Sequence, residues 1–503
     1  MSEVLKLVSK LKQDRSATAD SLEQLSVIIS TLSPDDIREI VRSSEIISTL
    51  LSSSERTASE TVLRKILQAL DPLEIATEHD RLVLRLLTAG SERTKSIALS
   101  CLESTARSLE GALRLANSSL LDPIIDIVGE NSLRCATSSV KILTSLTQFE
   151  ENVRIVLSPA RVKIFKEMSY SNDIVRHRIF DFYVSVAKVS FQAFEHCVKA
   201  NLFVDVETEL DSSDVLLQLN ALESLSELAS TAHGFAYLDS KSVPLKLENM
   251  LKKWLSGEDA LAALILPGVV KFFGRLCLAD DAERVANACQ DHPAFLLSVL
   301  TMLSSGDDSL VAVAIDTIEV LGSTAAGRAA LATEIPNEGR DAFSRLGDLV
   351  RSGSAPFRIR ALDAIGSALK YLSLVSEFVS ELSFQWFLAV DSCPLPLVVS
   401  IMKQPFADLH LAGLRAMCCI ASNKWGLQET FNCPGLLEYV LNRSTETCKE
   451  GRELKYEIVK TMAESPAVEM IFGSPTVIRL KTYVLEGPFF AVSQSTVAME
   501  GSN

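Results

Sequence analysis

Residues 172–187, NDIVRHRIFDFYVSVA, carry the pattern that sets the fold. When Asp181 is taken as position zero, the residue before it and the residue two places after it are apolar, and the residue five places after it is apolar as well. These positions fall on one stripe of an α-helix. The segment therefore predicts a helix with one face in a hydrophobic core and a charged residue beside that face.

The same pattern recurs along the chain at intervals of 38 to 52 residues. The zero positions are Glu23, Arg64, Glu103, Lys141, Asp181, Glu223, Lys271, Asp316, Asp363, Arg415 and Glu457. The residue before them is always apolar, and the residue two places after them is apolar except for Thr105. Periods of this length are typical of armadillo and HEAT repeats. We therefore predict an all-α protein, a right-handed α-solenoid of about eleven armadillo/HEAT-like repeats, and we name the helix around each zero position the inner helix.

A second signal follows the inner helix. The segments LASTAHGFAYL (228–238), LGSTAAGRAAL (321–331) and IASNKWGLQET (420–430) place Gly234, Gly327 and Gly426 eleven residues after the zero position, and Asn152 has the same offset. Glycine and asparagine tolerate the left-handed conformation that ends many helices. We expect these residues to adopt it where one repeat turns into the next.

The repeats predict a single solenoid over residues 1–486, because no change in composition marks a linker. The last stretch, residues 487–503 (GPFFAVSQSTVAMEGSN), has lost the periodicity and is rich in small polar residues. It is expected to be a loosely ordered tail, with Phe489 and Phe490 as candidates to anchor it.

Composition excludes several classes of partner. The chain has 503 residues, 47% of them hydrophobic, so it has enough apolar surface to fold. Its 49 basic and 64 acidic residues give a net charge of −15, which opposes binding to nucleic acids and anionic membranes. No segment resembles a signal peptide or a transmembrane helix. The ten cysteines form no C-x-x-C pair, so we expect them to be buried thiols in a reducing compartment. The expected location of the protein is therefore the cytoplasm, and the nucleus is also compatible with this pattern.

The residue patterns of known chemistry are missing from the sequence. The nearest approach to a phosphate-binding loop is GSTAAGRA (322–329), where Arg328 and Ala329 replace the required lysine and hydroxyl. The six histidines show no metal-ligand spacing. The pairs Asp280–Asp281 and Asp307–Asp308 are expected to cap helices rather than act as acid and base. We therefore expect no enzyme, no cofactor and no metal.

The repeats offer a surface instead. In a solenoid, one ridge of each inner helix lines an extended concave face that commonly binds partners. The candidate partner-binding residues on this ridge, named the ladder here, are Asp181, Glu223, Glu227, Lys271, Arg275, Asp316, Glu319 and Asp363. Two interpretations stay open: these are solvated helix positions that are simply charged, or they match the charges of a folded partner. Asp316 and Asp363 are expected to face solvent.

Six segments resemble the proteasome non-ATPase regulatory subunit 5 family in order and spacing, from about residue 60 to Phe490. They are NDIVRHRIFDF (172–182), LPGVVKFFGRL (266–276), AVAIDTIEVLGS (312–323), RIRALDAI (358–365), LKYEIVKTMA (454–463) and RLKTYVLEGPFF (479–490). The resemblance implies an assembly chaperone of the proteasome regulatory particle base that is absent from the finished particle. It also implies binding to the C-terminal domain of one proteasomal ATPase subunit, in an intermediate with a second ATPase and a large non-ATPase scaffold subunit. The resemblance assigns no functional residues to this chain. We expect the protein to be a monomer when no partner is bound.

The alternative is a general armadillo-type scaffold or cargo-binding adaptor. Armadillo cargo receptors bind basic peptides with tryptophan and asparagine arrays on their inner helices. The three tryptophans, Trp254, Trp386 and Trp425, are predicted to lie outside the inner helices, and no asparagine recurs on them. This placement disfavours the cargo receptor.

Overall fold

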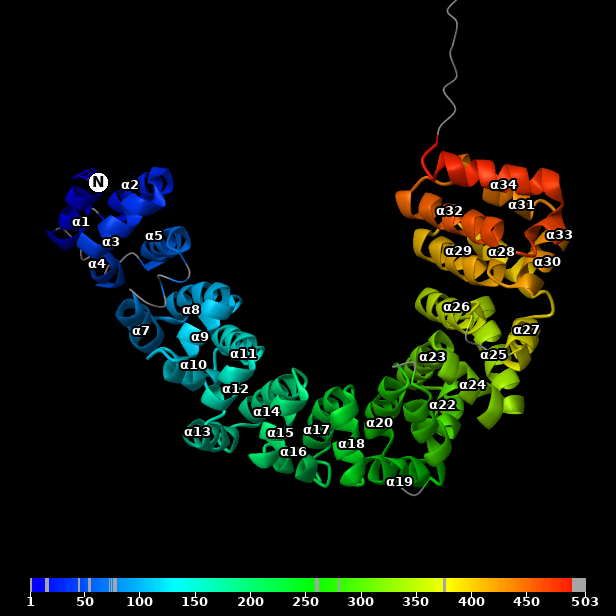
Figure 1. Cartoon of the computed structure of the whole chain (residues 1–503), viewed down its shortest axis with the longest axis horizontal. Coiled ribbons are helices and arrows are strands. Elements are labelled where there is room, and N and C mark those ends of the chain that lie inside the picture. Colours follow the sequence, from blue (N-terminus) through cyan, green and yellow to red (C-terminus); the bar gives the residue numbers. More distant parts are fainter. Residues whose placement is uncertain are drawn as a thin grey trace, which may run out of the picture. The chain divides into compact units, whose positions relative to one another are not determined.

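The computed structural model describes residues 2–13, 18–43, 46–52, 56–71, 73, 75, 79–257, 262–278, 281–373 and 377–490. Every regular element in these ranges is a helix (Figure 1). The chain divides into two compact units, Met1–Tyr237 and Leu238–Asn503. The all-α prediction is therefore confirmed for the described residues.

The first unit is built from helices of 6 to 15 residues. They are α1 (Ser2–Gln13), α2 (Thr18–Thr31), α3 (Pro34–Ser43), α4 (Ile46–Ser52), α5 (Arg56–Ala69), α7 (Asp80–Ala89), α8 (Glu92–Ala106), α9 (Leu109–Ala116), α10 (Leu121–Val128), α11 (Leu133–Thr147), α12 (Glu150–Val156), α13 (Pro159–Ser169), α14 (Asp173–Ala187), α15 (Phe191–Lys199), α16 (Val204–Glu209) and α17 (Val215–Leu228). The boundary between the units lies within α18 (Ala232–Ser240).

The second unit continues in the same style. Its helices are α19 (Val243–Leu255), α20 (Ala262–Leu276), α21 (Ala282–Ala286), α22 (Ala294–Leu303), α23 (Asp308–Ser323), α24 (Ala325–Glu334), α25 (Pro336–Ser352), α26 (Ala355–Leu369), α27 (Glu377–Val390), α28 (Pro394–Met402), α29 (Ala407–Ala421), α30 (Lys424–Asn432), α31 (Leu436–Leu441), α32 (Lys449–Glu464), α33 (Val468–Phe472) and α34 (Ser474–Glu486). A π-helix, η1 (Asn287–Asp291), and a 3-10 helix, η2 (Arg443–Thr445), lie among them.

The inner helices carry every third α label, from α2 to α32. All eleven zero positions lie in α2, α5, α8, α11, α14, α17, α20, α23, α26, α29 and α32. Within each unit, each inner helix packs against the next one. Side-chain caps start several of them; the carboxylate of Asp214 accepts from the amide of Leu216, and that of Asp307 accepts from the amide of Ser309, both at 2.8 Å. The repeat register predicted from the sequence is therefore the register of the fold.

Burial follows the predicted stripe. The residue before the zero position is buried in every repeat except at Val140 and Tyr456, which are half-buried. The residue two places after it is buried in all eleven, and Thr105, the one polar member, is 1% exposed. Its hydroxyl is satisfied locally, because it donates to the carbonyl of Cys101 at 3.3 Å.

The glycines at offset eleven lie at the repeat corners, but for a different reason from the expected one. Gly234, Gly327 and Gly426 are inside the short helices α18, α24 and α30, and they are not among the residues with positive φ. A Cβ added at any of them would clash with the carbonyl oxygen at offset five of the preceding inner helix. The expectation of a left-handed conformation is wrong; glycine is needed because two backbones meet. Asn152 meets the equivalent carbonyl, of Leu146, with its side-chain amide at 3.1 Å.

The structure describes only the first residues of the predicted C-terminal tail. Residues 491–503 of the predicted tail lie outside the described residues. Gly487 ends α34 with φ of 81°, and the guanidinium of Arg443 lies 5.6 Å from the ring centre of Phe490, which is still 44% exposed.

All ten cysteines are free thiols; five are buried, four are half-buried and Cys393 is exposed. The buried-thiol expectation is therefore right for five of them.

Candidate partner-binding surface

The ladder lies on inner helices, and each unit carries a part of it. In the first unit Asp181 lies on α14, and Glu223 and Glu227 lie on α17. In the second unit Lys271 and Arg275 lie on α20, Asp316 and Glu319 on α23, and Asp363 on α26. All eight are exposed or half-buried.

In the first unit the ladder is partly engaged by neighbours. The Asp181 carboxylate accepts from the Ser224 hydroxyl at 3.1 Å and lies 3.4 Å from Nε2 of His177. Burial raises the pKa of Asp181, and the nearby Glu223 and Glu227 add to this rise against the opposing effect of His177 and Ser224. Lys188, at the end of α14, pairs with Glu227 at 2.6 Å. This part of the ladder is acidic and linked from helix to helix.

In the second unit the ladder is a row of ion pairs across three consecutive inner helices. Arg360 on α26 lies 3.3 Å from the Asp316 carboxylate on α23. Arg415 on α29 donates to both carboxylate oxygens of Asp363 at 2.8 Å, which is the strong two-pronged geometry. Figure 1 shows α23, α26 and α29 following one another in this unit. The charges here are held in fixed positions before any partner arrives.

Glu319 differs from its neighbours in this row. It has no hydrogen bond or ion pair among the described residues, although it lies on the same face of α23 as Asp316. Burial raises its pKa, and the charges of Asp363 and Asp316 raise it further against the opposing effects of Arg415 and Arg360. A half-buried carboxylate among other carboxylates is the position in this row that a cation from outside would stabilise most.

The ion pairs change the expected exposure of one ladder residue, Asp363. Asp316 keeps 52% of its side chain exposed, as expected, but the side chain of Asp363 is only 25% exposed because Arg415 covers it. Sequence reasoning named Asp316 and Asp363 but missed their partners, Arg360 and Arg415. Arg360 could have been found, since it precedes Asp363 by three residues and therefore shares its helix face.

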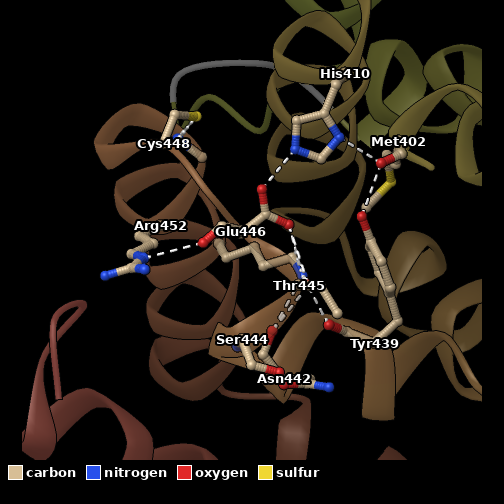
Figure 2. Close-up of polar contacts among 11 residues, drawn as sticks. Met402, His410, Tyr439, Asn442, Ser444, Thr445, Glu446, Cys448 and Arg452 are labelled. Atoms are coloured by element: carbon tan, nitrogen blue, oxygen red, sulfur yellow. Dashed lines mark hydrogen bonds and ion pairs between the residues drawn. The ribbon is translucent and has the colours of Figure 1, made fainter. Parts of the chain in front are cut away.

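A buried polar cluster at the C-terminal end of the second unit has the residue types of an acid–base site (Figure 2). The Glu446 carboxylate follows η2 and accepts from Nζ of Lys455 at 2.8 Å and from Nε2 of His410 at 2.6 Å. The other ring nitrogen of His410 faces the Met402 carbonyl, to which the Tyr439 hydroxyl also donates at 2.7 Å. Both ring nitrogens of His410 therefore face hydrogen-bond acceptors.

The electrostatics of this cluster are those of a buried salt bridge. Burial alone would raise the pKa of Glu446, but the hydrogen bonds from Lys455 and His410 outweigh it and hold this pKa below its ordinary value. Burial lowers the pKa of Lys455 despite the opposing effect of Glu446. The side chains of Lys455 and Glu446 are 0% and 2% exposed. The ammonium is also bonded to the carbonyls of Tyr439 and Asn442, at 2.9 and 3.2 Å. Because solvent does not reach this pair, the cluster is suited to joining α28, α29, α31 and α32 rather than to turning over a substrate.

Arg328, Asp281 and Asp307 have structural roles. Arg328, where a phosphate-binding lysine would stand, is 3% exposed and donates to the carbonyls of Gly322 and Ser367, both at 2.6 Å. It ties α24 to α23 and α26. Asp281 and Asp307 cap helices as expected, and Asp280 lies outside the described residues.

Two further properties concern the described part of the chain. Its His, Cys, Asp and Glu side chains form no group of three or more arranged to hold a metal ion. No single helix there has the length and apolar composition of a membrane span. Two pairs of consecutive helices have this length and composition when taken together, but each pair is bent at its joint. These pairs are Asp308–Ser323 with Ala325–Glu334, and Val379–Val390 with Pro394–Met402.

Comparison with solved structures gives neighbours of low similarity. A designed armadillo repeat protein in complex with the peptide (KR)4 has 17% identity and a TM-score of 0.40, over 51% of this chain and 98% of that chain. An engineered protein has 15% identity and a TM-score of 0.43, over 92% of this chain and 99% of that chain.

Comparison of sequences gives a full-length match. The 26S proteasome non-ATPase regulatory subunit 5 of Bos taurus is 30% identical over 505 residues, which cover 99% of this chain and 98% of that protein. The Homo sapiens protein of the same name is 30% identical over 90% of each chain, and the Drosophila melanogaster protein is 24% identical over 88% of this chain and 86% of that protein. The family model described as proteasome non-ATPase 26S subunit matches residues 2–503. Because the family model and these relatives cover nearly the whole chain, the chain belongs to the proteasome non-ATPase 26S subunit family.

Proposed function

We propose that this protein is a non-catalytic assembly chaperone of the proteasome regulatory particle base. It binds the C-terminal domain of a proteasomal ATPase subunit and leaves before the particle is complete. The observation that carries the proposal is the family membership over residues 2–503, with relatives named as a 26S proteasome non-ATPase regulatory subunit. A second ATPase and a large non-ATPase scaffold subunit belong to the same proposed intermediate.

The ion-paired row of the second unit is the proposed contact surface. Its charges are already ordered by Arg360 and Arg415, so a partner loses little additional side-chain entropy on binding. Glu319 supplies an unmatched negative charge in that row, which a lysine or arginine of the ATPase domain would neutralise. Partly exposed charges of this kind affect the association rate and partner choice more than total affinity, which suits a protein that must later dissociate.

Two observations support the non-catalytic part and disfavour the cargo adaptor. The cluster around Glu446, which has acid–base residue types, is closed to solvent. The tryptophans lie on α19, α27 and α30, outside the inner helices, so the ladder offers no tryptophan array to a basic peptide.

The test compares two double charge reversals in the full chain. Asp316→Lys with Glu319→Lys alters the ladder. Asp341→Lys with Glu438→Lys is the matched control, because these residues are exposed, lie on α25 and α31 and give the same change in charge. Asp363 is left unchanged, since its reversal would break the pair with Arg415.

The measurement is the association rate with each purified proteasomal ATPase C-terminal domain, at low and high salt. One domain should bind the wild type and the control equally, and the ladder variant at least about tenfold more slowly at low salt, with a smaller difference at high salt. Equal binding by a folded ladder variant would place the contact elsewhere. If the wild type bound none of the domains, the proposed function itself would be wrong.

A further inference from the structure

An open groove of about 450 Å³ lies in the second unit, away from the ladder. It is lined by Ser380, Glu381, Phe384, Lys424, Trp425, Gln428 and Ile471. These residues come from α27, α30 and α33, which lie close to one another in Figure 1 and include no inner helix. The groove is therefore a second surface, and nothing in the proposed function uses it.

The floor of the groove is aromatic and rigid. The half-buried ring of Trp425 lies 5.3 Å from the ring of Phe384 and 4.9 Å from that of Phe387, which is 1% exposed. Its indole nitrogen is buried and has no hydrogen-bond partner among the described residues, so ring packing alone holds it. Ile471 lines the groove from α33. Fixed tryptophan rings in such hollows are typical centres of binding energy at protein interfaces.

The walls carry opposite charges. Lys424 lies on α30 next to Trp425, and Glu381 lies on α27, three residues before Phe384. Both side chains are exposed, and neither forms an ion pair with a described residue. They are not paired with each other, so each is available to a group that enters the groove. A ligand that matches this site has an apolar centre, an anion on the Lys424 side and a cation on the Glu381 side.

We propose that this groove binds an extended segment of a partner protein, in which one large apolar side chain is flanked by an acidic residue and by a basic residue. The apolar side chain packs on Trp425, Phe384 and Ile471. The acidic residue pairs with Lys424 and the basic residue with Glu381, which fixes the direction of the segment. The volume of about 450 Å³ accommodates one or two side chains rather than a folded domain.

The test starts with a random-peptide phage library selected on the full chain. The enriched peptides are synthesised with a fluorophore, and their binding is measured by fluorescence anisotropy. We expect them to share an apolar residue between acidic and basic ones. Gln428→Trp fills the groove from an exposed position and should weaken binding at least about tenfold, whereas Gln428→Ala should stay within about twofold.

Charge reversal gives the sharper result. The double variant Glu381→Lys with Lys424→Glu should bind the original peptides more weakly and should regain affinity for peptides whose acidic and basic residues are exchanged. Selected peptides that bind Gln428→Trp as tightly as the wild type would overturn the proposal. So would self-association of the chain that Gln428→Trp abolishes, because the occupant would then be a second copy. The ladder-dependent association with an ATPase domain should be unchanged in Gln428→Trp, so the two proposals fail independently.

Discussion

Replacing Glu446 by glutamine should destabilise the second unit strongly although it changes the shape of the side chain little. Glutamine keeps the volume but removes the negative charge that faces Lys455 and His410. A buried ammonium that is 0% exposed cannot turn to water for compensation. The variant therefore leaves the Lys455 ammonium in a closed site without an anion.

The magnitude follows from those two contacts. Glutamine keeps one acceptor oxygen, so one hydrogen bond to a charged group is lost, at about 1.5 to 3 kcal/mol, and the other becomes a bond to a neutral acceptor. Removal of the anion from a buried ion pair costs about 3 to 5 kcal/mol, which sets the expected magnitude. For a unit of this size, such a loss lowers Tm by roughly 6 to 20 °C. Urea unfolding and calorimetry of the full chain measure it, with the exposed Glu438→Gln on α31 as a control expected within about 0.5 kcal/mol.

The stability difference between the wild type and Glu446→Gln should depend on pH. Because the pKa of Glu446 is lowered from its ordinary value of 4.5 on folding, its contribution is present above 4.5 and is lost as the pH falls through the lowered value. The stability difference between the wild type and Glu446→Gln should therefore shrink in acid. The double variant with Lys455→Met should cost less than the sum of the single variants, since it removes the stranded ammonium. A difference below about 1 kcal/mol at neutral pH would refute this account of the cluster.

Three further substitutions probe the repeats. Leu222→Ala, at a side chain 1% exposed before the zero position of α17, should cost about 2 to 5 kcal/mol in urea unfolding, and an unchanged midpoint would contradict the assigned register. Gly347→Ala should cost about 1 to 3 kcal/mol, because the added methyl clashes with the backbone carbonyl of Val390 and forces α25 and α27 apart; Gly306→Ala, which has nothing within 4 Å of the added methyl, is the control. Asp363→Asn should cost less than about 1 kcal/mol, because the pair with Arg415 is partly solvated, and a larger loss by calorimetry would show that this pair is structural.

The inner helices could be predicted from the sequence because their pattern is local. Helical periodicity requires only neighbours three and four residues apart, so the eleven zero positions follow from the sequence alone. Thr105 is the exception to this periodicity. A polar residue breaks the apolar pattern, yet the helix buries it because its hydroxyl bonds to its own backbone.

The contacts between repeats could not be predicted in the same way. The pair of Asp363 with Arg415 joins residues 52 positions apart, and Glu446 meets His410 across 36 positions. Which of several charges on a ridge meet depends on the offset between packed helices, which periodicity does not specify. The ladder was therefore identified as a set of charged positions, while its division into paired charges and an unpaired Glu319 required the structure.

The glycine corners determine where this chain can change its length. At Gly234, Gly327 and Gly426 the inner helix and its successor touch backbone to backbone, so the joint permits neither a longer connection nor a larger residue. The connections that directly follow α20 and α26, two inner helices without a glycine at offset eleven, are longer. Natural insertions, affinity tags and reporter domains should therefore be rejected directly after α17, α23 and α29, and they should be better accepted directly after α26.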